Sequence, residues 1–276
     1  MVPTKALSNP KERDLITDWM RVGFIHGVMN TDNMAISGES IDFGPCAFMD
    51  HYDPKTVFSS IDHHGRYAFG NQPIIAQWNL ARLADALLPL FDENENKAIE
   101  VGEEIIQSFN EKYEKKFHEM MKKKLGFITD EPEDGVLVKE LLDTMEKNKL
   151  DYTNTFRDLM NENISNENLK DFYSKWTIRI DKQNRDKKEI LNLMRKNNPV
   201  VIPRNHKVEE SLKEAHKGNL LSLNNLLNAL KDPYTERGDL MLYQQPAPDN
   251  EKKYNGKFFI NRTITKSIGT RICIKN

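Results

Sequence analysis

The spacing of apolar residues along the chain predicts a protein built mainly from helices. Leu15, Ile16 and Trp19 place an apolar face on residues 10–22, and Pro10 suits the first turn of a helix. The same apolar period recurs through most of the chain. It predicts further helices over residues 73–89, 95–124, 134–148, 153–162, 166–180, 184–197, 206–217 and 219–230.

For two of these helices, the sequence also predicts which side chains are buried and which are exposed. Trp78, in the first, is predicted to be a core residue rather than a platform for a ligand. The end of the 95–124 helix, KKFHEMMKKK, is predicted to be a solvated face, because cations are favoured at helix C-termini. Contact with nucleic acid is the alternative for this end. The residues of the 95–124 helix predicted to face inward are Ile99, Ile105, Ile106, Phe109, Tyr113 and Phe117.

A short β-hairpin is predicted between residues 34 and 43. Residues 34–36 and 40–43 flank a turn at Gly38. This hairpin would place Asn33 before the first strand and Asp42 at the end of the second. Their side-chain oxygens could then face one cation, since magnesium prefers hard oxygen ligands. On the hairpin pattern alone, the two polar residues could equally be ordinary turn formers.

The stretch HGVMNTDNMAISGESIDFG, which begins at His26, holds the strongest chemical signal. In protein kinases a His-x-Asp-x-x-x-x-Asn loop supplies the catalytic base and one metal ligand, and a following Asp-Phe-Gly supplies the second. His26 and Asn33 keep the seven-residue offset, and Asp42 begins a literal Asp-Phe-Gly. The base position holds Val28, which argues against an ordinary kinase and against a small-molecule kinase of the aminoglycoside type. The nearby carboxylate is Asp32.

Three segments closely resemble the selenoprotein O (SelO) family, which is protein-kinase-like. They are VGFIHGVMNTDNM, IDFGPCAFMDHYDP and DHHGRYAFGNQPIIAQWNLARLADALLP. The resemblance covers roughly residues 14–91, and a weaker resemblance is found in NPVVIPRNHKVEESLKEA. It implies a mainly α protein with a small β-hairpin: a protein-kinase-like C-lobe with a helical C-terminal extension. It also implies metal-dependent transfer of AMP from ATP to Ser, Thr or Tyr hydroxyls of target proteins, with Mg²⁺ or Mn²⁺. Transfer of UMP is an alternative.

The same resemblance implies roles for individual residues. Asp32 corresponds to the catalytic base, and Asn33 and Asp42 correspond to the metal ligands, with Asp42 also at the nucleotide. In kinases the glycine-rich loop and the Lys–Glu pair precede the catalytic loop, but only 25 residues precede His26. We therefore expect the N-lobe to be absent from this chain and ATP binding to be weak. A separate N-terminal half is then a partner, and an inactive helical interaction module is the alternative function.

The remaining polar residues and the prolines divide the chain further. Residues 1–92 are predicted to hold the catalytic loop and Asp-Phe-Gly, residues 93–232 a helical C-lobe extension, and residues 233–276 an irregular tail that begins at a Pro-containing stretch. Arg66 is predicted to order its loop or to meet a phosphate or a target carboxylate. A zinc site is a weak alternative, without regular ligand spacing, for His51, Asp53, Asp62, His63 and His64.

Composition and charge exclude several classes of protein. Hydrophobic residues make up 38% and charged residues 30% of the chain, and the net charge is −2, so no overall field draws it to nucleic acid or to anionic membranes. The chain contains no run of 18 apolar residues, which is about the length needed to span a membrane. Cys46 and Cys273 are predicted to be separate thiols, whereas the family resemblance implies a disulfide. The resemblance also implies a soluble protein of the cytoplasm or mitochondria.

Overall fold

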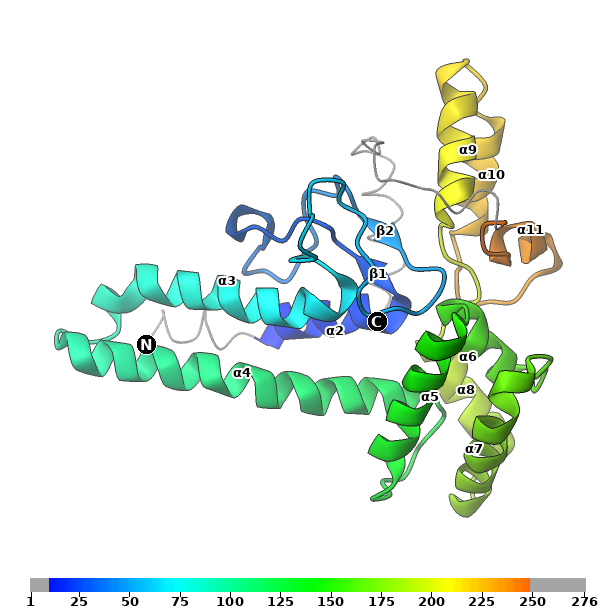
Figure 1. Ribbon diagram of the computed structural model, residues 1–276, viewed down its shortest axis with the longest axis horizontal. Helices are drawn as coiled ribbons and strands as arrows, with labels where there is room; N and C mark the ends of the chain where they lie inside the picture. Colours follow the sequence, from blue (N-terminus) through cyan, green and yellow to red (C-terminus); the bar gives the residue numbers. More distant parts are fainter. Residues whose placement is uncertain (1–9, 249–276) are drawn as a thin grey trace.

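The computed structural model describes residues 10–248, which form a mainly helical structure with one small sheet (Figure 1). Three helices form its first part: α2 (Pro10–Val22), α3 (Gln72–Leu87) and α4 (Glu95–Lys124). Helix α2 packs on both α3 and α4, and α3 and α4 run side by side. They pack because each carries an apolar stripe, and packing of such stripes supplies most of the stability of helices in proteins.

The far end of α4 leads into a group of shorter helices, and a helical hairpin follows. The group contains α5 (Asp134–Asn148), α6 (Tyr152–Met160), α7 (Lys170–Lys182) and α8 (Lys187–Asn197). The hairpin pairs α9 (Asn205–His216) with α10 (Leu221–Ala229), and α11 (Met241–Gln244) lies beside it in Figure 1. Every helix predicted from apolar spacing is therefore confirmed, with ends that differ by at most four residues.

The predicted hairpin over residues 34–43 is wrong. Only Met34 and Ser40 pair there, as an isolated bridge. The turn forms, because Gly38 has a positive φ of 71° and its N–H donates to the Ala35 carbonyl at 2.9 Å. The ladder ends after the bridge because Asp42, at a φ of 52°, leaves the extended conformation.

The two strands of the observed sheet come before and after that loop in the sequence. Strand β1 (Phe24–Ile25) runs antiparallel to β2 (Ala47–Phe48), with Phe24 opposite Phe48 and Ile25 opposite Ala47. All four residues are buried. The loop with the predicted catalytic residues therefore begins and ends at one buried, two-stranded base.

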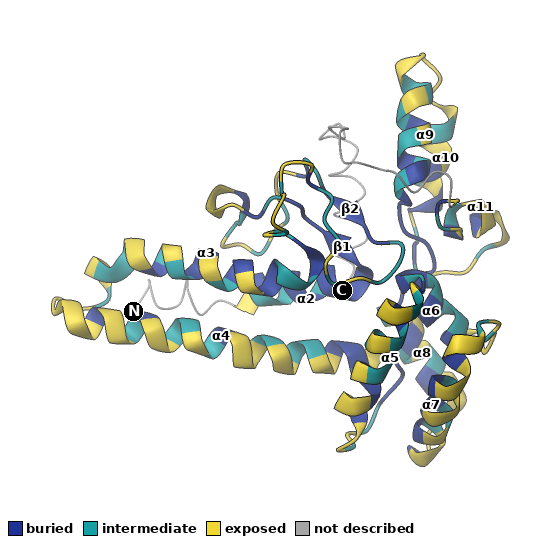
Figure 2. Ribbon diagram, viewed as in Figure 1, coloured by how far each residue is buried: buried dark blue, intermediate teal, exposed yellow. Residues whose placement is uncertain are grey.

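Burial confirms most, but not all, of the predicted core. Figure 2 shows buried residues gathered around β1, β2 and α2, while much of α4 is exposed. In α4, Phe109 is buried, but Ile99 is 38% exposed, so its predicted inward orientation is wrong. The other four predicted residues, Ile105, Ile106, Tyr113 and Phe117, are partly buried against the core.

The lysine-rich end of α4 is also not simply a solvated face. Lys124 is only 1% exposed, its Nζ donates to the Arg21 carbonyl at 2.8 Å, and it lies 3.9 Å from the centroid of the Phe156 ring. Burial, together with the nearby Arg21 charge, lowers the pKa of Lys124 well below its usual range. This lysine therefore connects α4 to α2 and α6 and is not available to nucleic acid.

A buried arginine joins the beginning of α9 to the first part of the chain. The Arg204 guanidinium donates to Asp50 at 2.6 Å, to Asp151 at 2.7 and 3.1 Å, and to the Gln244 carbonyl at 2.8 Å. Asp50 follows β2, and Asp151 caps the N-terminus of α6 by accepting from the Asn154 N–H at 2.7 Å. One side chain thus connects segments that lie far apart in the sequence.

Replacing Arg204 by methionine is expected to lower the free energy of unfolding by about 3–5 kcal/mol. Burial raises the pKa of Asp151, the Arg204 charge opposes that rise, and the substitution leaves the buried carboxylate unpaired. Chemical denaturation measures the loss. The control is Arg157→Met, which breaks a partly exposed ion pair with Glu236 and should cost less than about 1 kcal/mol. Equal losses in the two variants would contradict this assignment.

Ordered structure continues beyond residue 233 into the region predicted to be an irregular tail. A 3-10 turn (Gly238–Leu240) leads into α11, and Leu240 and Gln244 are buried. The part of the predicted tail after residue 248 lies outside the described residues, as does Cys273. Within residues 10–248, no helix combines the length and the apolar character needed to cross a membrane.

Candidate functional site

The loop that begins at His26 is held in place from α3. The Gln72 side chain, at the start of that helix, accepts from the His26 N–H at 3.0 Å and donates to the Phe24 carbonyl at 3.0 Å. Gly27 has a φ of 85°, and a Cβ there would lie 2.8 Å from the Pro45 carbonyl oxygen. Glycine is therefore required where the loop passes the residue that follows Asp-Phe-Gly.

His26 is a buried structural residue that positions the segment before Asp42. Its Nε2 lies 2.8 Å from the Ile41 carbonyl oxygen, and its ring lies 5.3 Å from that of Trp19. Because a carbonyl only accepts hydrogen bonds, Nε2 carries the proton. Burial lowers the pKa of His26, although the Ile41 carbonyl opposes the change. Burial thus disfavours the charged form of the histidine, and its ring anchors the loop.

Asn33 and Asp32 lie in one short turn with different exposure. The turn is a 3-10 helix (Thr31–Asn33) with Asn30 as its N-cap. Asn33 is buried, and its Nδ2 donates to the Val28 carbonyl at 3.0 Å. This bond uses the amide nitrogen and fixes the side chain, so Oδ1 is the atom that could bind a metal. Asp32 is exposed and could reach a group outside the protein.

Asp42 is exposed at the end of the same loop. The Met34–Ser40 bridge and the His26–Ile41 hydrogen bond tie its segment to that of Asn33. Among the described residues, no three His, Cys, Asp or Glu side chains come together as a metal site, so the zinc alternative for residues 51–64 is wrong. Amide and carboxylate oxygens, as in Asn33 and Asp42, are the donor type that Mg²⁺ or Mn²⁺ takes, and magnesium is usually bound by one or two carboxylates together with substrate phosphates.

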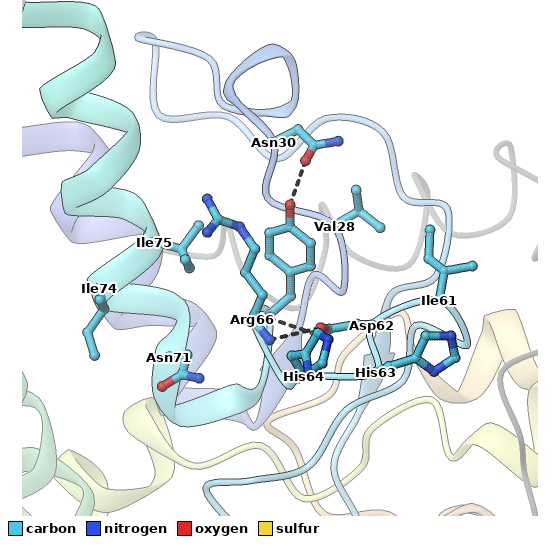
Figure 3. A pocket seen from close by; sticks show the side chains of 11 residues that line it. Val28, Asn30, Ile61, Asp62, His63, His64, Arg66, Asn71, Ile74 and Ile75 are labelled. Atoms are coloured by element: carbon cyan, nitrogen blue, oxygen red, sulfur yellow. Dashed lines mark hydrogen bonds between the residues drawn. The ribbon is translucent and has the colours of Figure 1, made fainter.

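A pocket of about 660 Å³ lies beside this loop (Figure 3). The Tyr67 hydroxyl donates to Asn30 Oδ1 at 2.5 Å, and the Asp62 carboxylate accepts from the Arg66 and Tyr67 N–H groups, both at 2.8 Å. In the figure, Ile74 and Ile75 come from α3, and Ile61 from the loop on the other side. The lining residues are Val28, Asn30, Ile61, Asp62, His63, His64, Arg66, Tyr67, Asn71, Ile74 and Ile75.

Trp78 lies near this pocket and not in the core, so its predicted environment is wrong. It is 42% exposed, and the guanidinium of Arg66 lies 4.6 Å from its ring centroid. Helical spacing placed Trp78 on the apolar face, but in the structure its ring lies under the charged side chains of Arg66 and Arg82. The pocket was likewise missed from the sequence, although the Asp62 to Tyr67 turn that forms its wall lies in the recognised DHHGRYAFGN segment.

The amino-acid sequence is similar to that of known proteins. The family model described as "Protein adenylyltransferase SelO" matches residues 10–231. A "Protein nucleotidyltransferase YdiU" from Pelagibacter ubique is 51% identical over 251 residues, which is 88% of this chain and 52% of that protein. Proteins of the same name from Clostridium perfringens and Bacillus thuringiensis are 51% and 49% identical over 84% and 87% of the chain. The chain spans about half the length of these relatives.

Proposed function

The chain belongs to the SelO family of protein nucleotidyltransferases, and from this we propose that it carries the catalytic loop of a protein adenylyltransferase. The observation that supports the proposal most directly is the anchored loop. It carries an exposed carboxylate at Asp32, a fixed amide at Asn33 and a second exposed carboxylate at Asp42. Asn33 and Asp42 keep the metal-ligand positions of the motif, whereas Asp32, next to Asn33, is the carboxylate that would act as base in place of Val28.

The proposed reaction joins a Ser, Thr or Tyr hydroxyl of a target protein to AMP. The hydroxyl oxygen attacks the α-phosphorus of ATP, a new O–P bond forms, and the bond to the bridging oxygen breaks so that pyrophosphate leaves. Asp32 accepts the hydroxyl proton as a general base. UTP would give UMP transfer by the same bond changes.

Asn33 and Asp42 would hold Mg²⁺ or Mn²⁺ in this reaction. A divalent cation supplies neutralisation of the charge that develops on the phosphates. Asn33 contributes an amide oxygen whose position is set by the Val28 hydrogen bond, and His26 positions the backbone next to Asp42. The chain's own residues thus prearrange the ligands, which is the main way that proteins accelerate phosphoryl-type transfers.

The proposed reaction is tested by labelling ATP at different phosphates and measuring which label reaches the protein substrate. The preceding half of the Pelagibacter ubique relative would be joined to residues 10–276 to give a full-length chimera. ATP labelled at the α-phosphate should label protein substrates in the presence of Mn²⁺, whereas ATP labelled at the γ-phosphate should not. Labelling from the γ-phosphate would instead make the protein a kinase, and α-labelled UTP distinguishes UMP transfer from AMP transfer.

We also propose that the nucleotide-binding lobe lies in the part of the relatives that this chain does not match. The 276-residue chain is then expected to fold but to show neither micromolar ATP binding nor transfer by itself, because a ligand normally needs most of its surface enclosed. Calorimetric titration with ATP and Mg²⁺ measures this, with the intact relative as the positive control. Micromolar affinity or self-labelling of the isolated chain would refute the expectation, whereas an inactive chimera would favour an interaction module.

A further inference from the structure

We propose that the pocket lined by Asn30, Arg66 and Ile61 binds the segment of the target protein next to the modified hydroxyl. It would take an acidic side chain at Arg66 and an aliphatic side chain beside Ile61. This inference rests on the proposed function, because it assigns a recognition site to the protein substrate of that reaction. Its evidence is the position of the pocket, its charge and its apolar rim.

The pocket shares a wall with the catalytic loop. Asn30 lines the pocket and is also the N-cap of the turn that carries Asp32. The Asn33 N–H donates to the Asn30 carbonyl at 2.9 Å, and the Asn33 side chain donates to the carbonyl of Val28, another lining residue. A segment bound in the pocket would therefore continue directly past the exposed Asp32 carboxylate.

Arg66 gives the pocket a cation suited to a carboxylate. Its guanidinium stacks on Trp78, and within residues 10–248 no carboxylate lies within ion-pair distance of it. The nearby Asp62 carboxylate accepts from two backbone N–H groups of its own turn. Stacking holds the planar guanidinium while leaving N–H groups for a paired, bidentate contact with a carboxylate.

The rim of the pocket is apolar and exposed. Ile61 is 77% exposed and Ile74 is 59% exposed, and Figure 3 shows them on opposite sides of Arg66. A covering aliphatic side chain would remove this surface from water, which is favourable. A nucleotide polyphosphate suits the pocket less well, because its lining sets one arginine and two histidines beside the Asp62 carboxylate and three isoleucines. A peptide segment matches both properties.

The test measures peptide binding by the complete 276-residue chain without nucleotide, so that its result does not depend on transfer. Peptides with a central Ser, Thr or Tyr and randomised flanking positions are captured on the immobilised chain. The expected result is enrichment of Asp or Glu at one flanking position and of Leu, Ile or Val at another. Absence of any positional preference would overturn the proposal, whereas peptide binding without transfer in the chimera would overturn only the adenylyltransferase function.

Charge reversal identifies the residue responsible. Arg66→Glu should weaken binding of the best acidic peptide about tenfold or more, and should favour its Lys-substituted counterpart. The matched control is Arg82→Glu, since Arg82 also lies over Trp78, at 5.4 Å, but pairs with Asp85 and does not line the pocket. Equal effects of the two variants would refute the assignment, as would Arg66-dependent binding of pyrophosphate in place of peptide.

The apolar contact has its own pair of variants. Ile61→Ser should reduce the preference for an aliphatic flanking residue, because it removes an exposed apolar wall of the pocket. Ile178→Ser is the control, since Ile178 on α7 is similarly exposed, at 69% against 77% for Ile61, but lies outside the lining. An unchanged preference in Ile61→Ser would remove this side of the pocket from the proposal.

Discussion

Replacing Asp42 by alanine in the full-length chimera is expected to abolish nucleotide transfer. The substitution removes the charged member of the proposed metal-ligand pair, and the other proposed ligand, Asn33, supplies only a neutral oxygen. The side chain is exposed, so its loss opens no core cavity. Protein labelling from α-labelled ATP with Mn²⁺ measures the loss, and thermal melting checks that the fold is retained.

Asp42→Asn is the matched companion, because the backbone at Asp42 has a φ of 52°. Alanine is strained in that conformation by about 1–2 kcal/mol, whereas asparagine adopts it readily. Loss of transfer in both variants would assign the effect to the lost charge and not to backbone strain. Asn33→Ala should weaken metal dependence less completely. Wild-type labelling by the Asp42 variants would refute the metal-ligand assignment.

Replacing Asp32 by alanine is expected to reduce the transfer rate by about two to four powers of ten, the range for loss of a general base. No carboxylate stands at Val28, the usual base position, to replace it. Nucleotide affinity should be retained, because Asp32 is exposed on its turn and the predicted metal ligands are Asn33 and Asp42.

Separate measurement of kcat and of the KM for nucleotide shows whether Asp32 acts as a general base or as a nucleotide-binding residue. A lower kcat with an unchanged KM supports the base. A large increase in KM with unchanged kcat would instead make Asp32 a binding residue. The exposed Asp53 provides a control carboxylate, since its Oδ1 accepts from the Lys55 N–H at 2.7 Å within its own turn. Asp53→Ala should leave both constants unchanged.

Positioning residues explain why the site could be predicted only in part. Gln72 and His26 place the loop through hydrogen bonds to Phe24 and Ile41, and Arg204 ties α9 to residues that follow β2. Gln72 and Arg204 were recognised only within family-like segments, without these partners. Gln72 and Phe24 lie 48 residues apart in the sequence, and Arg204 and Asp50 lie 154 apart, so these partners are not visible in local spacing.

The sequence by itself determined the helices and the identity of the loop. Helix formation follows the spacing of neighbours three and four residues apart, so α2, α4 and α5 begin and end where their apolar period does. The motif likewise depends on short offsets, and the family match agrees with it over residues 10–231.

Only the tertiary structure decided burial and the shape of the site. Lys124 is buried because three helices meet around it, whereas Trp78 is 42% exposed and lies under the side chains of Arg66 and Arg82. The strands β1 and β2 pair with each other because both lie in the core, and Asp42 turns the chain away from the predicted hairpin. The pocket beside Asn30 exists for the same reason: which face of an element is covered depends on distant segments, which local periodicity does not contain.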